Sequence, residues 1–156
     1  METEEQGWGS KIRDWDGWVF ELGRLSEEPV GALDMAERHE AMLRVCRKRL
    51  LRNGLKEAKS PMPTFRPDVF AEKRSSRGGV KRELAVEAEI ESTLFKEHTS
   101  GQLVIMDTYM RHKRKSGIRV DGYLLVPPGK QAVAHAQALL DSLFPSGTRI
   151  RVLSFR

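Results

Sequence analysis

Carboxylates gather in two stretches of the chain that both have the composition of a β-strand. Asp68 follows a proline within the extended run Arg66–Ala71, and Glu87 and Glu89 alternate with apolar residues in the run Leu84–Glu91. Because strand side chains alternate between two faces, Glu87 and Glu89 are expected on the same face. An antiparallel pairing of the two strands would set Asp68 beside them, and clustered carboxylate oxygens suit Mg²⁺ or Mn²⁺. The sequence therefore predicts a divalent metal site here.

The segment between the two strands and the helix before them complete this interpretation. Arg74–Gly79 has the composition of a turn, which favours an antiparallel hairpin. Glu40, on the helix predicted to precede the strands, is a fourth candidate metal ligand. The alternative is an ordinary amphipathic strand whose glutamates face water, with Asp68 serving as a turn or capping residue.

The apolar pattern predicts the elements that would hold these side chains. We expect helices at 10–25, 33–53, 99 or 102 to 115 and 130–144, and strands at 65–71, 84–91, 118–126 and 148–155, with 55–63 as a connection. A strand through 18–20 is the alternative to the first helix. Helices between strands imply parallel pairing, whereas the short turn implies an antiparallel pair. The expected fold class is therefore α/β, with a mixed central sheet flanked by helices. Residues 33–156 would form this domain, and residues 1–32 a helical extension packed on it.

The motifs and the order of elements together resemble the PD-(D/E)xK nuclease superfamily, the fold of many restriction and repair endonucleases. In that family an acid at the start of one strand, often after proline, and a (D/E)-x-K motif on the next strand bind Mg²⁺ and activate water. Pro67 and Asp68 match the first element, and Glu87-x-Glu89 matches the second, with Glu89 where lysine is usual. The resemblance implies a restriction endonuclease-like core with Asp68, Glu87 and Glu89 as catalytic residues. The missing lysine's charge would come from a second metal, Lys96 or Lys73.

Basic residues are concentrated in two runs, at 44–52 and at 111–115, and the net charge of the chain is +5. The second run contains Arg111, Lys113, Arg114 and Lys115, at the end of a predicted helix. These four side chains are predicted to contact nucleic-acid phosphates, and a solvated helix end explains them equally well. The partner implied by the resemblance is DNA, bound by a homodimer or a larger DNA-processing complex.

The remaining reactive side chains give weaker signals. His98, just after the acidic strand, is the better histidine candidate for proton transfer, while His39 is expected on a helix surface. Cys46 is the single cysteine, expected to be buried on a helix. The chain has no apolar run long enough to span a membrane and no signal-peptide pattern at its start, which predicts a cytoplasmic protein with no membrane partner.

The function predicted from these features is that of a metal-dependent endonuclease, or of the nuclease subunit of a DNA-processing assembly. A catalytically inactive nuclease-fold module that binds nucleic acid or a protein is the alternative, favoured by the loss of the usual lysine. An unrelated structural or assembly protein is the third interpretation.

Overall fold

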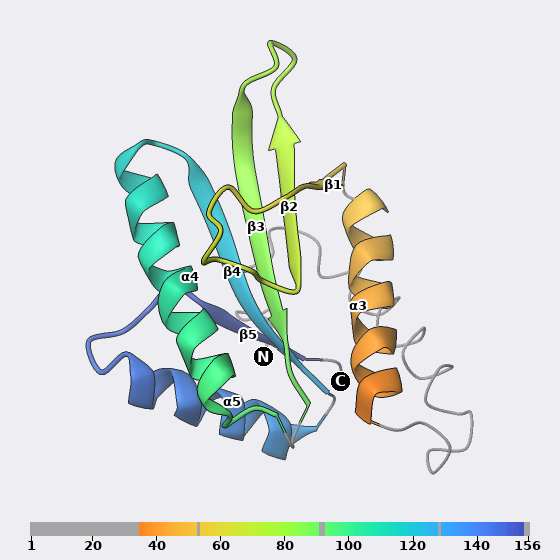
Figure 1. Ribbon diagram of the computed structural model, residues 1–156, viewed down its shortest axis with the longest axis vertical. Helices are drawn as coiled ribbons and strands as arrows, with labels where there is room; N and C mark the ends of the chain where they lie inside the picture. Colours follow the sequence, from red (N-terminus) through yellow and green to blue (C-terminus); the bar gives the residue numbers. More distant parts are fainter. Residues whose placement is uncertain (1–34, 53, 91–92, 128, 155–156) are drawn as a thin grey trace.

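The computed structural model describes residues 35–52, 54–90, 93–127 and 129–154, which form a five-stranded mixed sheet with three helices (Figure 1). The elements are α3 (Met35–Arg52), β1 (Lys56–Glu57), β2 (Val69–Arg74), β3 (Val80–Ala88), α4 (Glu97–Lys115), β4 (Arg119–Val126), α5 (Lys130–Leu143) and β5 (Arg151–Ser154). The α/β class and the mixed sheet are thus confirmed. The helix predicted at 10–25 and the extension at 1–32 lie outside the described residues. No described helix is both long and apolar enough to cross a membrane.

The strands follow one another across the sheet in chain order, β1-β2-β3-β4-β5. The first three are antiparallel, and β3, β4 and β5 are parallel to one another. The turn between β2 and β3 is closed by the Ser75 N–H bond to the Gly79 carbonyl at 2.8 Å, and Gly78 adopts a φ of 87° that favours glycine. This hairpin pairs Val69 with Val86, so the residues that follow Val86 lie beside those that precede Val69.

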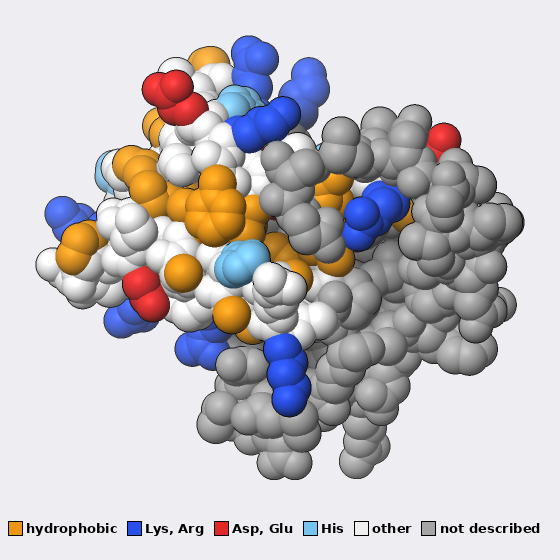
Figure 2. Space-filling model, turned by 90° about the horizontal axis from the view of Figure 1, so that it is seen from below, with side chains coloured by type: hydrophobic (Ala, Val, Ile, Leu, Met, Phe, Trp, Pro, Cys, Tyr) orange, Lys and Arg blue, Asp and Glu red, His pale blue; other side chains and the backbone are white. Residues whose placement is uncertain are grey.

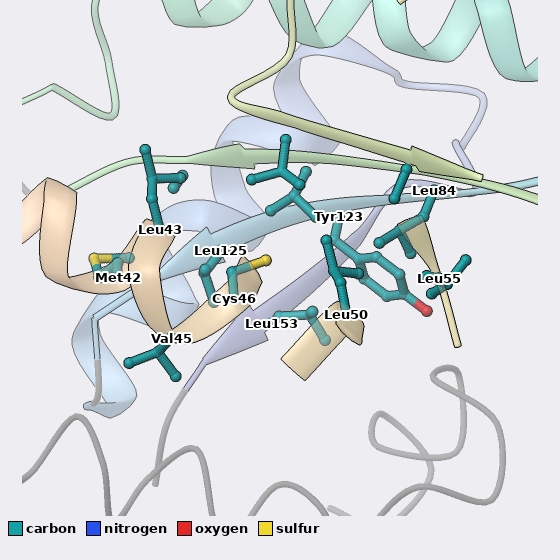
Figure 3. Close-up of a cluster of buried hydrophobic side chains, with 14 of the residues drawn as sticks. Met42, Leu43, Val45, Cys46, Leu50, Leu55, Leu84, Tyr123, Leu125 and Leu153 are labelled. Atoms are coloured by element: carbon teal, nitrogen blue, oxygen red, sulfur yellow. The ribbon is translucent and has the colours of Figure 1, made fainter. Parts of the chain in front are cut away.

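Alternation along the strands gives each face of the sheet its own apolar core. On one face α3 packs its buried side chains against Leu84, Val86 and Ala88 of β3 (Figure 3). On the other face α4 and α5 cover Ala85, with Phe70 of β2 and Leu124 of β4. Because side chains on a strand repeat every two residues, the odd-numbered glutamates of β3 belong to the face covered by α4 and α5.

The predicted boundaries differ from the observed ones around the first three strands, and β3 spans Val80–Ala88 rather than 84–91. β1 lies within the stretch predicted as a connection, and it has two exposed residues with no apolar alternation to reveal it. It forms because its backbone pairs with β2, an arrangement that the Ala58 N–H bond to the Phe70 carbonyl at 2.9 Å continues. β2 begins at Val69 rather than at 65 and extends through polar residues to Arg74, since backbone pairing with β3 continues to the turn.

The contact between α4 and β4 depends on Gly122. A Cβ added at Gly122 would lie 2.5 Å from the Sδ of Met110 and 3.0 Å from the Sδ of Met106. We expect Gly122→Ala to lower the free energy of unfolding by about 1–3 kcal/mol, because both methionines must move away from the sheet. Urea denaturation measures this change.

Gly101 provides the matched control within α4. It is exposed, and a Cβ added there would meet nothing within 4 Å. Gly101→Ala should leave stability unchanged or raise it by up to about 1 kcal/mol, since alanine favours a helix. Equal stability of Gly122→Ala and the wild-type protein would contradict the close packing of α4 on β4.

Candidate metal centre

Three carboxylates meet at the point where β2 begins and β3 ends. Asp68, Glu87 and Glu89 each offer one carboxylate oxygen, and these oxygens all lie within 4.8 Å of one another. Glu87 and Glu89 are only 3% and 7% exposed, whereas the Asp68 side chain is 25% exposed. The structure therefore brings together the three residues predicted to share a metal, with Asp68 on the solvent side of the cluster.

Backbone hydrogen bonds fix the positions of these three residues. Asp68 Oδ2 accepts the Ala88 N–H at 2.8 Å, beyond the last ladder pair of β2 with β3. Glu89 donates its own N–H to the Leu125 carbonyl at 2.9 Å, which extends the contact of β3 with β4 by one residue. The cluster is thus built on paired backbone on both sides of β3, which limits how far its carboxylates can move apart.

His39 of α3 contacts the cluster from the other side of Ala88. Its Nε2 lies 2.8 Å from the Ala88 carbonyl oxygen and 3.5 Å from Asp68 Oδ2. A carbonyl oxygen only accepts, so Nε2 carries the hydrogen of this bond. His39 and Asp68 therefore bind the two backbone polar groups of Ala88, the residue between the two glutamates.

His39 was predicted to lie on the surface of its helix because its neighbours in sequence are polar, and this prediction is wrong. His39 is partly buried, and it lies three, four and seven residues before the buried Met42, Leu43 and Cys46. Residues at this spacing lie on one side of a helix. That periodicity is the sequence signal that could have placed His39 against the sheet.

Burial and mutual repulsion dominate the electrostatics of the cluster. The pKa of Glu87 is raised to about 9, mainly by burial and then by the negative charges of Asp68 and Glu89. Glu87 Oε1 is also buried without a hydrogen-bond partner in the described part of the chain. A buried, unpartnered oxygen beside two other carboxylates is an environment that a divalent cation would satisfy. The three residues thus fit a hard metal ion such as Mg²⁺ or Mn²⁺.

Acidic side chains are sparse on the face shown from below in Figure 2, where hydrophobic side chains gather near the centre and Lys and Arg side chains lie around them. Glu87 and Glu89 are interior residues, whereas Asp68 lies on the solvent side of the cluster.

Several other residues singled out in the sequence lie apart from the cluster. Glu40 is exposed and does not belong to the group of three. Lys73 pairs with Arg82 at the far end of β2, and Lys96 is exposed directly before α4. His98 is exposed in the first turn of α4.

The basic run at the end of α4 divides into different environments. Arg111 binds Asp107 at 2.8 Å, and Lys113 Nζ lies 5.6 Å from the centre of the Tyr109 ring. Arg114 and Lys115 are exposed, and Arg114 also lines a cavity. Nucleic-acid binding by these four residues remains a prediction.

Comparison with known proteins gives no family to which the chain can be assigned. No protein-family model, curated protein or solved structure matches it. The chemistry of the cluster is therefore inferred from its donor atoms and their surroundings.

The contact of His39 with Ala88 predicts that this histidine supports metal binding without being a ligand. We expect His39→Ala to weaken Mn²⁺ binding by roughly tenfold, the lower end of the range for groups that orient metal ligands. His39→Gln, which can still donate to a carbonyl, should retain more of the affinity. Isothermal titration calorimetry measures both.

Glu40 is the matched control, because it is the next residue on α3 and is exposed. Glu40→Ala should bind Mn²⁺ as the wild-type protein does. Loss of affinity in Glu40→Ala with none in His39→Ala would reverse the roles assigned to these two neighbours.

The raised pKa of Glu87 predicts how stability depends on pH in the presence of a chelator. Folded Glu87 keeps its proton to about pH 9, whereas an unfolded glutamate loses it near pH 4.3. The folded state then binds more protons between these values, so the free energy of unfolding falls as pH rises, by up to about 1.4 kcal/mol per pH unit. Glu87→Gln should reduce this fall and be more stable than wild type at pH 8 but not at pH 5. Urea unfolding at several pH values measures it.

Glu97→Gln, the same substitution at an exposed position in α4, should keep the wild-type dependence on pH. Addition of Mn²⁺ at pH 8 should stabilise the wild-type protein more than Glu87→Gln, because the cation offsets the ionised cluster. Parallel stability curves for the wild-type protein and Glu87→Gln would show that Glu87 does not hold its proton in the folded state.

Proposed function

We propose that this protein is a Mg²⁺- or Mn²⁺-dependent phosphodiesterase that cleaves nucleic acid, DNA by its resemblance to the PD-(D/E)xK nucleases. The observation that carries the proposal is the meeting of Asp68, Glu87 and Glu89 within 4.8 Å at the adjoining ends of β2 and β3. Oxygen-only ligands of this kind suit the cations that phosphoryl transfer uses.

The order and pairing of the elements support a restriction endonuclease-like core. After α3, an antiparallel hairpin carries the acids, and a helix, a parallel strand, a second helix and a further parallel strand follow. Asp68 directly precedes β2, and Glu87 and Glu89 lie at the end of β3, which is the arrangement expected from the resemblance. Motif and topology therefore favour the same family, although each alone is a common pattern.

The chain's own residues would act by position and charge. Asp68, Glu87 and Glu89 would hold the cation, while the Ala88 backbone and His39 keep the Asp68 carboxylate in place. Glu87 would release its proton when the cation binds, because the cation favours the ionised carboxylate. Once bound, the cation neutralises phosphate charge and lowers the pKa of an attacking water.

The position of Glu89 supports an active variant of the motif. Glu89 is 7% exposed and belongs to the carboxylate group, so it stands in the site where the family's lysine usually lies. It adds a ligand oxygen and removes a positive charge, which a second cation would then have to supply. An inactive module that binds nucleic acid or protein is the alternative, favoured by the placement of Lys73 at the far end of β2. Assembly as a homodimer or in a larger DNA-processing complex, and a cytoplasmic location, stay predictions.

Cleavage assays test the proposal directly. Plasmid and single-stranded DNA are incubated with the wild-type protein in Mg²⁺, in Mn²⁺ and in chelator, and the products are separated on gels. We expect cleavage only with the metals, and a loss of at least about 100-fold in Asp68→Asn and in Glu87→Gln, because each variant removes a ligand charge.

Glu83→Gln is the matched control, since Glu83 is buried on the same face of β3 and accepts the Tyr109 hydroxyl at 2.6 Å. Glutamine can accept the same bond, so this variant should cleave as the wild-type protein does. Equal cleavage by the wild-type protein, Asp68→Asn and Glu87→Gln would exclude the carboxylate cluster as the active site.

A further inference from the structure

A second site lies at the opposite end of the sheet from the carboxylate cluster. An open cavity of about 580 Å³ is lined by the end of α4, the start of β4 and the segment that leads into β5. In Figure 1 the end of α4 and the start of β4 lie together at the upper left, whereas β3 ends in the lower half. The two sites are therefore separate.

The cavity exists because β4 and β5 are paired over only half of β4. Their ladder begins at Tyr123 with Arg151, so in the described chain no strand covers the preceding four residues of β4 on this side. The opposite wall is held in place by the Thr148 hydroxyl, which donates to Asp107 Oδ1 at 2.6 Å. Asp107 also binds Arg111, so the segment entering β5 is fixed against α4. The cavity is thus framed by residues with defined partners.

Arginines from three parts of the chain converge on this cavity. Arg114 comes from α4, Arg119 from β4, Arg149 from the segment before β5 and Arg151 from the first position of β5. Asp121 is the acid in the cavity lining, which gives the four arginines and one aspartate a net charge of +3.

The charge of Asp121 is already shared by two arginines. Arg82 binds it at 2.8 Å and Arg119 at 3.2 Å. Arg114, Arg149 and Arg151 are exposed and have no carboxylate partner among the described residues. The cavity lining therefore includes three arginines whose charge is not offset by a carboxylate within the described structure, and guanidinium groups suit phosphate through paired hydrogen bonds.

We propose that this arginine cavity binds backbone phosphates of the same nucleic-acid chain on which the carboxylate cluster acts; the proposal rests on the proposed function. Each phosphodiester carries one negative charge, so a net charge of +3 is better balanced by several phosphodiesters than by a single one. Arg119 in the cavity lining pairs with Arg82, which precedes Glu87 by five residues on β3. At about 3.3 Å per residue, the cavity and the carboxylate cluster are therefore roughly 17 Å apart along the strand. A duplex that rises about 3.4 Å per base pair would span this distance in about five pairs. The cavity would thus hold the substrate away from the cleaved bond.

Binding by charge-neutralised variants tests the cavity. Arg114→Gln, Arg149→Gln and Arg151→Gln, and the triple variant, are titrated in chelator against a fluorescent 30-base-pair duplex at several salt concentrations. We expect each single variant to bind several-fold more weakly and the triple variant at least about tenfold more weakly, with the salt slope lowered by about one per lost contact. Lys56→Gln, which removes an exposed cation from β1 at the opposite edge of the sheet from β5, is the control and should bind nearly as the wild-type protein does.

Catalytic readouts separate this inference from the proposed function. The triple variant should cleave duplex DNA more slowly, while Mn²⁺ affinity and hydrolysis of the small diester bis-p-nitrophenyl phosphate stay at wild-type levels. Normal binding by the triple variant, beside inactive Asp68→Asn, would overturn the cavity inference and leave the proposed function standing. Weakened binding by the triple variant, with no cleavage by the wild-type protein, would support the cavity and refute the proposed function. Displacement of the duplex by millimolar ATP or inorganic phosphate with equal effectiveness would overturn a polynucleotide ligand.

Discussion

The close packing of three carboxyl groups is the constraint on which this end of the sheet depends, because they repel one another whenever all three are ionised. Two glutamates that are almost wholly buried and a partly buried aspartate offer oxygens within 4.8 Å, and one glutamate oxygen has no partner in the described structure. Burial of ionised carboxylates away from water is costly, and Glu87 therefore keeps its proton to about pH 9. The arrangement persists because β3 is paired on both sides close to the cluster, through Asp68 on one side and Leu125 on the other. Sheet pairing and the raised pKa of Glu87 thus keep together three groups that would repel one another if all were ionised.

The two faces of the sheet contribute differently to the site. On one face, α3 packs an apolar core and brings His39 to the Ala88 carbonyl. On the other face, α4 covers the glutamate side of β3, and Tyr109 donates to buried Glu83 at 2.6 Å. Glu83 therefore has a neutral donor, whereas the Glu87 oxygen four residues later has none. Two glutamates with the same parity on one strand thereby acquire different roles, one structural and one available to a cation.

Local patterns explain why much of the carboxylate cluster was predictable. Strand parity placed Glu87 and Glu89 together, and the turn composition of Arg74–Gly79 implied the hairpin that brings Asp68 to them. His39 and β1 were missed because their neighbours in sequence are polar, and tertiary packing and backbone pairing decide their environments. The arginine cavity, in contrast to His39, has no signal in the sequence, since it depends on where the ladder of β4 and β5 begins. The periodicity of apolar residues predicts which face of a helix or strand a side chain occupies. It does not predict over how many residues two strands distant in sequence will pair.

Glu89 stands where the motif usually has lysine, and its burial helps to decide whether the site can still bind a cation. Buried ionisable groups cost stability, and well-packed apolar side chains of similar size are often more stable in their place. A fold with no use for a cation would gain stability from an apolar residue at this position, next to a Glu87 whose pKa is already raised by its neighbours. Glu89 instead remains in the group with Asp68 and Glu87, on backbone fixed by Leu125. Structure that is unfavourable without a ligand is typical of functional sites, which favours a cation-binding role for all three acids.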